Sequence, residues 1–160
     1  MATAILQQPA ARERLVGHVY ETLVVSNRHD QLRAKDGVLA PERVRSLVLP
    51  GVLVDTGATS VCLPADMVAA LGLDVLRTVV ATTAAGDIEV RVFDDMRLSV
   101  LGREGTFECL ELPVGSRPLL GVVPMEMLGL EPDLKNHRLR LLPDDGPGTY
   151  VLIYRARPQA

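Results

Sequence analysis

Apolar and polar residues alternate along most of the chain in short runs that are separated by turn residues. A period of two places every second side chain on one face, as in a β-strand with one buried side. Many short strands at close spacing predict an all-β fold, either a barrel or a sandwich. The segments expected to be strands are His18–Ser26, Val44–Leu49, Val52–Val54, Thr78–Thr83, Ile88–Phe93, Met96–Leu101, Thr106–Leu112, Leu139–Leu142 and Tyr150–Tyr154.

Two short segments carry helix signals instead. Pro64–Leu71 opens on a proline, which suits a first helical position, and Gly72 follows as a stop. Pro124–Leu128 ends in the same way at Gly129. The polar stretch Asn27–Gly37 has no apolar period and closes on a turn dipeptide, so it is predicted to be a loop.

The composition fits one domain of 160 residues whose core is built from Val, Leu, Ala and Met, since aromatic residues make up only 3%. The net charge of −3 is spread along the chain and gives no basic patch for nucleic acid. Apolar runs are too short to span a bilayer, and no basic, apolar leader opens the chain. We therefore expect a cytoplasmic protein without nucleic-acid or membrane partners.

Outside one loop, most reactive side chains show no sequence pattern of a catalytic or metal-binding site. Cys62 and Cys109 are too few for a disulfide framework and are expected to be buried or half-buried free thiols. The three histidines do not have metal-ligand spacing, and no phosphate-binding loop is present, so no metal or cofactor is predicted. Ser60 has no glycine elbow, which disfavours a serine hydrolase.

The exception is the loop that follows the apolar run Val52–Val54. This run delivers Asp55 into Thr56-Gly57, where glycine permits a close backbone approach. Asp-Thr-Gly-Ala also occurs as an ordinary turn, so its context decides what it means. Two such carboxylates in contact share a proton, and one can activate a water while the other polarises a carbonyl. The motif occurs once, so the second carboxylate must come from another chain.

The order of several motifs resembles that of the retropepsin-like aspartic peptidases, in particular the short single-domain bacterial type. Gly17–Tyr20 is similar to the opening strand of those proteins, and Val52–Thr59 to their catalytic loop. Leu119–Val122 resembles the second apolar-apolar-Gly element, and Met125–Leu130 the helix after it. The resemblance implies a small closed β-barrel with one or two short helices, paired as a two-fold homodimer.

The resemblance also implies roles for individual residues. Asp55 would be the catalytic carboxylate, Thr56 would hydrogen-bond across the dimer, and Gly57 would contact substrate through its backbone. The rest of the site would comprise the loop residues Ala58 and Thr59, the flap tip Ala84, Ala85, Gly86 and Asp87, and the support Leu119, Leu120 and Gly121, which crosses beneath the loop in a ψ shape.

The expected organisation is an arm over residues 1–16, a peptidase domain over 17–143 and an extension over 144–160, which is either an interface strand or an edge strand of the same sheet. The leading hypothesis is a homodimeric aspartic endopeptidase acting on polypeptides without a metal or cofactor. The alternative is a peptide-binding or dimerisation module with little or no turnover on the same fold. An inactive regulatory partner of another protein is a third possibility that the sequence leaves open.

Overall fold

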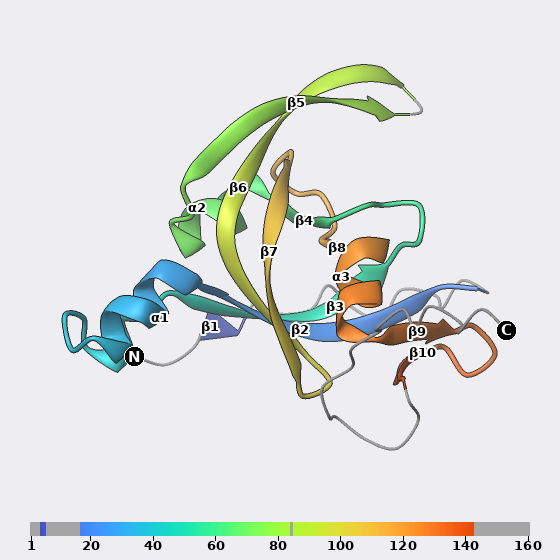
Figure 1. The fold of residues 1–160 in the computed structure, drawn as a ribbon. Coiled ribbons are helices and arrows are strands. Elements are labelled where there is room, and N and C mark those ends of the chain that lie inside the picture. Colours follow the sequence, from blue (N-terminus) through green and yellow to red (C-terminus); the bar gives the residue numbers. More distant parts are fainter. Residues whose placement is uncertain (1–3, 6–16, 84, 143–160) are drawn as a thin grey trace, which may run out of the picture.

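The protein is described here by a computed structural model that covers residues 4–5, 17–83 and 85–142 (Figure 1). It is mostly β-structure with few short helices, as the alternating pattern predicts. The helices are α1 (Arg28–Lys35), α2 (Ala65–Leu71) and α3 (Val122–Leu128), with a 3-10 turn η1 (Pro41–Arg43). The strands are β1 (Ala4–Ile5), β2 (Val19–Asn27), β3 (Ser46–Val54), β4 (Val61–Pro64), β5 (Val75–Thr83), β6 (Gly86–Val100), β7 (Arg103–Leu112), β8 (Leu119–Leu120), β9 (Leu130–Asp133) and β10 (Arg138–Leu141).

Six strands form a ring in the order β3, β2, β6, β7, β4, β8. The ring closes because β8 pairs with β4 on one side and, in parallel, with β3 on the other. β1 adds a parallel strand to β3, and β5 pairs with β6 outside the ring. β9 and β10 form a separate antiparallel hairpin. The short strand β8 thus lies between the two strands that flank the Asp55 loop.

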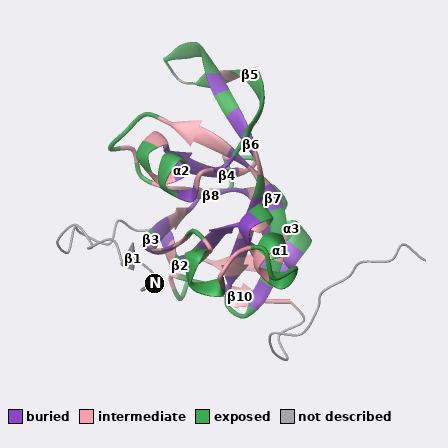
Figure 2. Cartoon of the chain, turned by 90° about the vertical axis from the view of Figure 1, so that its left-hand side faces the viewer, coloured by how far each residue is buried: buried purple, intermediate pink, exposed green. Residues whose placement is uncertain are grey.

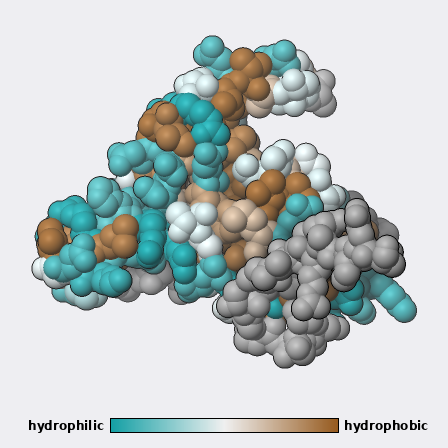
Figure 3. All heavy atoms as spheres, in the orientation of Figure 1, coloured by the Kyte–Doolittle hydropathy of each residue, from teal (hydrophilic) through white to brown (hydrophobic). Residues whose placement is uncertain are grey.

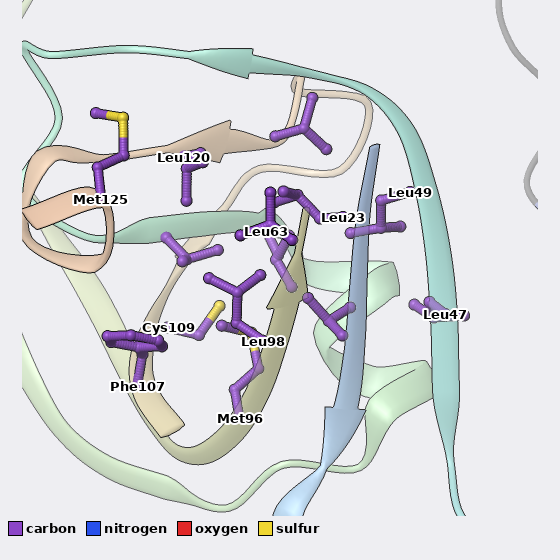
Figure 4. Close-up of a cluster of buried hydrophobic side chains, with 14 of the residues drawn as sticks. Leu23, Leu47, Leu49, Leu63, Met96, Leu98, Phe107, Cys109, Leu120 and Met125 are labelled. Atoms are coloured by element: carbon purple, nitrogen blue, oxygen red, sulfur yellow. The ribbon is translucent and has the colours of Figure 1, made fainter. Parts of the chain in front are cut away.

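The ring encloses one hydrophobic core (Figure 4). Its side chains come from every second position of the strands, so the alternation in the sequence becomes an inner and an outer face. Leu23, Leu63, Leu98 and Leu120 are fully buried there, and Phe107 fills one end. Aliphatic side chains make up nearly all of this core, as the low aromatic content requires.

The prediction of a loop at Asn27–Gly37 is wrong, because residues 28–35 form α1. This helix has no apolar face, so periodicity could not reveal it. It is held by its ends instead: the Asn27 side chain accepts a hydrogen bond from the Asp30 backbone N–H at 3.0 Å. Asp30 is itself buried and pairs with Arg45, whose Nε lies 2.6 Å from the Asp30 carboxylate. The signals that identify α1 are therefore its caps.

Two predicted strand breaks are also wrong. β3 runs through Pro50 and Gly51, which form a bulge with Gly51 at a φ of 66°. β6 runs through Asp94 and Asp95 in the same way, with Asp95 at a φ of 57° and a register shift against β7. Breaker residues here bend a strand and do not end it.

The two predicted helices are confirmed as α2 and α3. Gly72 and Gly129 end them in the left-handed conformation, with φ of 57° and 61°. The strands β4 and β9 were not expected, because each is only four residues long and adjoins a helix. The strand predicted at Tyr150–Tyr154 lies outside the described residues.

Candidate active site

The loop between β3 and β4 places Asp55 at the end of a buried strand. Val52 and Val54 point into the core and fix the direction of β3. The Asp55 backbone N–H then donates to the Leu120 carbonyl at 3.0 Å, which ties the start of the loop to β8. At the other end of the loop, the Val122 N–H donates to the Ala58 carbonyl at 2.8 Å. The loop is therefore held on both sides by the segment that runs from β8 into α3.

Gly121 is the point where this segment crosses the loop most closely. A Cβ atom at Gly121 would lie 2.4 Å from the carbonyl oxygen of Ser60 and 2.6 Å from that of Ala58. These are backbone atoms that cannot move aside as a side chain can. Its φ of −87° is open to any residue, so the need for glycine here is one of space.

The carboxylate of Asp55 is half-buried at the surface of this loop. Its Oδ1 accepts a hydrogen bond from the backbone N–H of Gly57 at 2.9 Å, which fixes the side chain in one orientation. Thr56, Gly57 and Thr59 are exposed, and Ala58 is half-buried. All five residues predicted for the loop therefore lie together on one support, with the carboxylate accessible to solvent.

A long hairpin of β5 and β6 projects from the ring, at the top of Figure 1. Its outer half is exposed on nearly every residue (Figure 2). In the space-filling view it overhangs an open hollow on the side of the molecule where the Asp55 loop lies (Figure 3). The predicted flap residues Ala85, Gly86 and Asp87 form its tip, whereas Ala84 lies outside the described residues.

Two kinds of contact shape this hairpin. At the tip, the Thr83 hydroxyl donates to the Gly86 carbonyl at 2.7 Å, and the Thr82 hydroxyl donates to Asp87 at 2.8 Å. At the base, the Arg77 guanidinium reaches the Glu108 carboxylate of β7 at 2.7 Å. Among the described residues, the outer part of the hairpin buries only Val90 deeply.

A comparison with protein families gives a match at this same part of the chain. Residues 51–123 match the family described as "gag-polyprotein putative aspartyl protease". The matched region begins in β3 and ends in α3, so it contains the Asp55 loop, the hairpin and the crossing at Gly121. The matched family is a retropepsin-like aspartyl protease domain. A search of curated proteins finds no match.

The matched region brings together two of the three predicted groups. Backbone hydrogen bonds join the loop to the segment from β8 into α3, through the Leu120 carbonyl and the N–H groups of Val122 and Val123. Leu119 and Gly121 belong to the same segment. The third group is the tip of the β5–β6 hairpin. Among the described residues, it makes no hydrogen bond to the loop. Sequence reasoning did not anticipate β4, which brings Cys62 next to the site.

Both cysteines of the matched region are free and buried, as predicted. Burial raises the pKa of the Cys62 thiol to about 11, and the negative charge of Asp55 acts in the same direction. Burial likewise raises the pKa of Cys109. Neither thiol is a thiolate at neutral pH, so neither competes with Asp55 as the reactive group.

Two further features of the described residues bear on the site. No group of three His, Cys, Asp or Glu side chains in this part of the chain is placed to hold a metal ion. None of the described helices is long and apolar enough to cross a membrane.

Proposed function

We propose that the protein is an aspartic endopeptidase whose catalytic pair consists of Asp55 from each of two copies. The observation that carries the proposal is the position of Asp55: an accessible carboxylate on a loop held at both ends by β8 and α3. Catalysis by a carboxylate requires a fixed side chain near its working position, because small displacements lower the rate steeply. The match to an aspartyl protease family supports the same conclusion.

The proposed reaction needs two carboxylates with one proton between them. The ionised carboxylate takes a proton from a water molecule, which attacks the carbonyl carbon of the peptide bond. The protonated carboxyl hydrogen-bonds the carbonyl oxygen and transfers its proton as the tetrahedral intermediate forms. The carboxyl that took the proton from water then passes it to the leaving nitrogen, the other carboxylate takes a proton back from a hydroxyl of the intermediate, and the C–N bond breaks. The apparent pKa values would belong to the pair and not to either Asp55 alone.

A second copy is the natural source of the second carboxylate. Within the described residues of one chain, Asp55 accepts a hydrogen bond from Gly57 and from no acidic neighbour. A two-fold axis beside the loop would place the same residue of both copies in one site. Thr56 is exposed at this surface and carries a hydroxyl that could bond the partner loop.

The β5–β6 hairpin would cover the bound peptide. Its exposed tip at Ala85, Gly86 and Asp87 could close over a substrate held against the loop and exclude water other than the attacking molecule. An extended polypeptide suits this arrangement, because both the loop and the hairpin tip offer backbone groups for pairing.

The test compares the wild type with Asp55→Asn on a peptide library between mildly acidic and neutral pH. Asp66→Asn is the matched control, since Asp66 is exposed on α2 and undergoes the same chemical change. Activity should be lost in Asp55→Asn and kept in Asp66→Asn. When the wild type is separated by size and its mass is measured by light scattering, the activity should be found in the dimer. Equal cleavage by wild type and Asp55→Asn would contradict the proposal. Peptide binding without turnover would favour the binding module.

A further inference from the structure

A row of outward-facing side chains leads from the Asp55 loop along the surface of the ring. Leu53 precedes Asp55 by two residues, so the two side chains leave β3 on the same face. Tyr20 of β2 is paired with Leu53, and Leu119 of β8 is paired with it from the other side. All three side chains are half-buried and lie outside the core. We call Tyr20, Leu53 and Leu119 the apolar row.

Arg117 lies at the end of this row. Its Nη1 donates to the Tyr20 hydroxyl at 3.0 Å, and its guanidinium carbon lies 5.5 Å from the centre of the Tyr20 ring. The chain next to it is fixed as well, because the Pro118 carbonyl accepts a hydrogen bond from the Leu53 N–H at 3.2 Å. The guanidinium is therefore held in place by an aromatic ring and remains exposed.

Arg117 differs in its partners from most of the other arginines that the structure describes. Six arginines in the described part of the chain pair with Asp or Glu: Arg45, Arg77, Arg91, Arg97, Arg138 and Arg140. Arg117 has no carboxylate partner among the described residues. A guanidinium placed over an aromatic ring, with N–H donors left for another group, is suited to bind a carboxylate in a planar and directional way.

We propose that Arg117 binds an Asp or Glu side chain of the peptide substrate, so that the enzyme favours apolar residues at the cleaved bond with an acidic residue nearby. This inference rests on the proposed peptidase function. Counted along the parallel β3–β8 pair, Arg117 lies four residue steps before the level of Asp55. That is about 13 Å, so the acidic residue would lie about two to four residues from the cleaved bond.

The symmetry of the proposed dimer extends this preference. A two-fold axis through the catalytic pair would place one Arg117 on each side of the cleaved bond. An acidic residue could then be recognised on either side of that bond. Arg77, at the base of the β5–β6 hairpin, is already paired with Glu108 and would not compete.

The test uses ten-residue peptides with blocked ends and apolar central residues, so that no terminal carboxylate is present. Glu or Gln is placed at the second, third or fourth position from the centre on either side. For the best position, we expect kcat/KM to favour Glu over Gln by about tenfold at low salt. The preference should weaken at high salt, because the guanidinium is exposed.

Variants of Arg117 locate the source of this preference. The Glu-to-Gln ratio should fall towards one in Arg117→Gln, stay partly above one in Arg117→Lys, and fall below one in Arg117→Glu. Arg43→Glu is the matched control, since Arg43 is exposed on η1, beside α1. An unchanged ratio in Arg117→Gln, or a wild-type preference for Gln, overturns the inference.

A binding arm separates this inference from the proposed function. Fluorescent versions of the same peptides are titrated with Asp55→Asn and with Asp55→Asn/Arg117→Gln, and anisotropy reports the dissociation constants. If no peptide is cleaved, the peptidase proposal fails, yet tighter binding of Glu than Gln that is lost with Arg117 still supports the present inference. Equal binding of Glu and Gln peptides in both proteins contradicts it, whatever the cleavage result.

Discussion

The Asp55 loop and the tip of the β5–β6 hairpin are both surface turns, yet they are built in opposite ways. The loop donates or accepts backbone hydrogen bonds with β8 and α3 at both of its ends, and Gly121 crosses it with no room for a Cβ atom. The described hydrogen bonds of the hairpin tip join residues of the hairpin itself. Around Gly86 a Cβ atom would meet nothing within 4 Å.

This difference separates two requirements of the proposed reaction. A carboxylate that must meet a second carboxylate and a water needs a fixed position, which contacts from the ring provide. A cover that must admit and release a polypeptide needs few contacts with the body, and regions with few buried contacts open at low cost. The two turns can therefore be tested by substitutions that act on only one of them.

Gly121→Ala should have the largest effect. The new methyl would overlap backbone oxygens of Ser60 and Ala58, so the crossing segment and the loop would have to separate. We expect a loss of about 3 kcal/mol in the free energy of unfolding and at least about a 100-fold loss of kcat/KM. Denaturant titration and peptide cleavage measure the two. Wild-type activity in Gly121→Ala would show that the loop is not held as described.

Asp30→Asn is the control, because it should lower stability by a similar amount at a position distant from the Asp55 loop. It removes the charge that pairs with Arg45, at the end of the molecule that carries α1. The Asp30 side chain is 5% exposed and that of Arg45 46%, so the loss should be about 2 kcal/mol, below that of a fully buried pair. Activity per folded molecule should stay near the wild type. A matching fall in activity would mean that Gly121→Ala acts through stability alone.

The same pair gives a pH dependence with a definite sign. Hydrogen bonds from the Arg45 side chain hold the pKa of the Asp30 carboxyl below its usual range. A group with a lowered pKa in the folded state stabilises fully above its unfolded pKa of about 4 and loses that contribution as the pH falls through the folded value. The stability difference between wild type and Asp30→Asn should thus shrink below about pH 4. Denaturant titrations at pH 6 and pH 3 measure it.

The sequence predicts the β-rich fold where side-chain alternation and turn residues agree. The ends of α2 and α3 could be predicted from Gly72 and Gly129, because glycine readily adopts the left-handed conformation that ends a helix. It fails at α1, because that helix is stabilised by capping and by the Asp30–Arg45 pair, which joins residues 15 apart. Contacts of this kind have no period to detect.

The site divides in the same manner. The position of Asp55 directly after a buried strand could be predicted, because the apolar run before it specifies that strand. The closure of the ring by β8 depends on a pairing between residues far apart in the chain, such as Leu53 and Leu119. Arg117 could not be found from the sequence, since its place beside Tyr20 comes from a contact between residues 97 apart.

Gly86→Ala should have the smallest effect on stability and tests the other half of the comparison. Gly86 has a φ of 116°, so alanine is strained there, but its surroundings are open. We expect a loss of about 1 kcal/mol or less, because an exposed tip can relax. If the hairpin covers the substrate, kcat/KM should fall by more than this stability loss implies, since the closed tip is where the strain acts. Unchanged kcat/KM in a folded Gly86→Ala protein would separate the tip from catalysis and leave the Asp55 loop as the whole of the site within one chain.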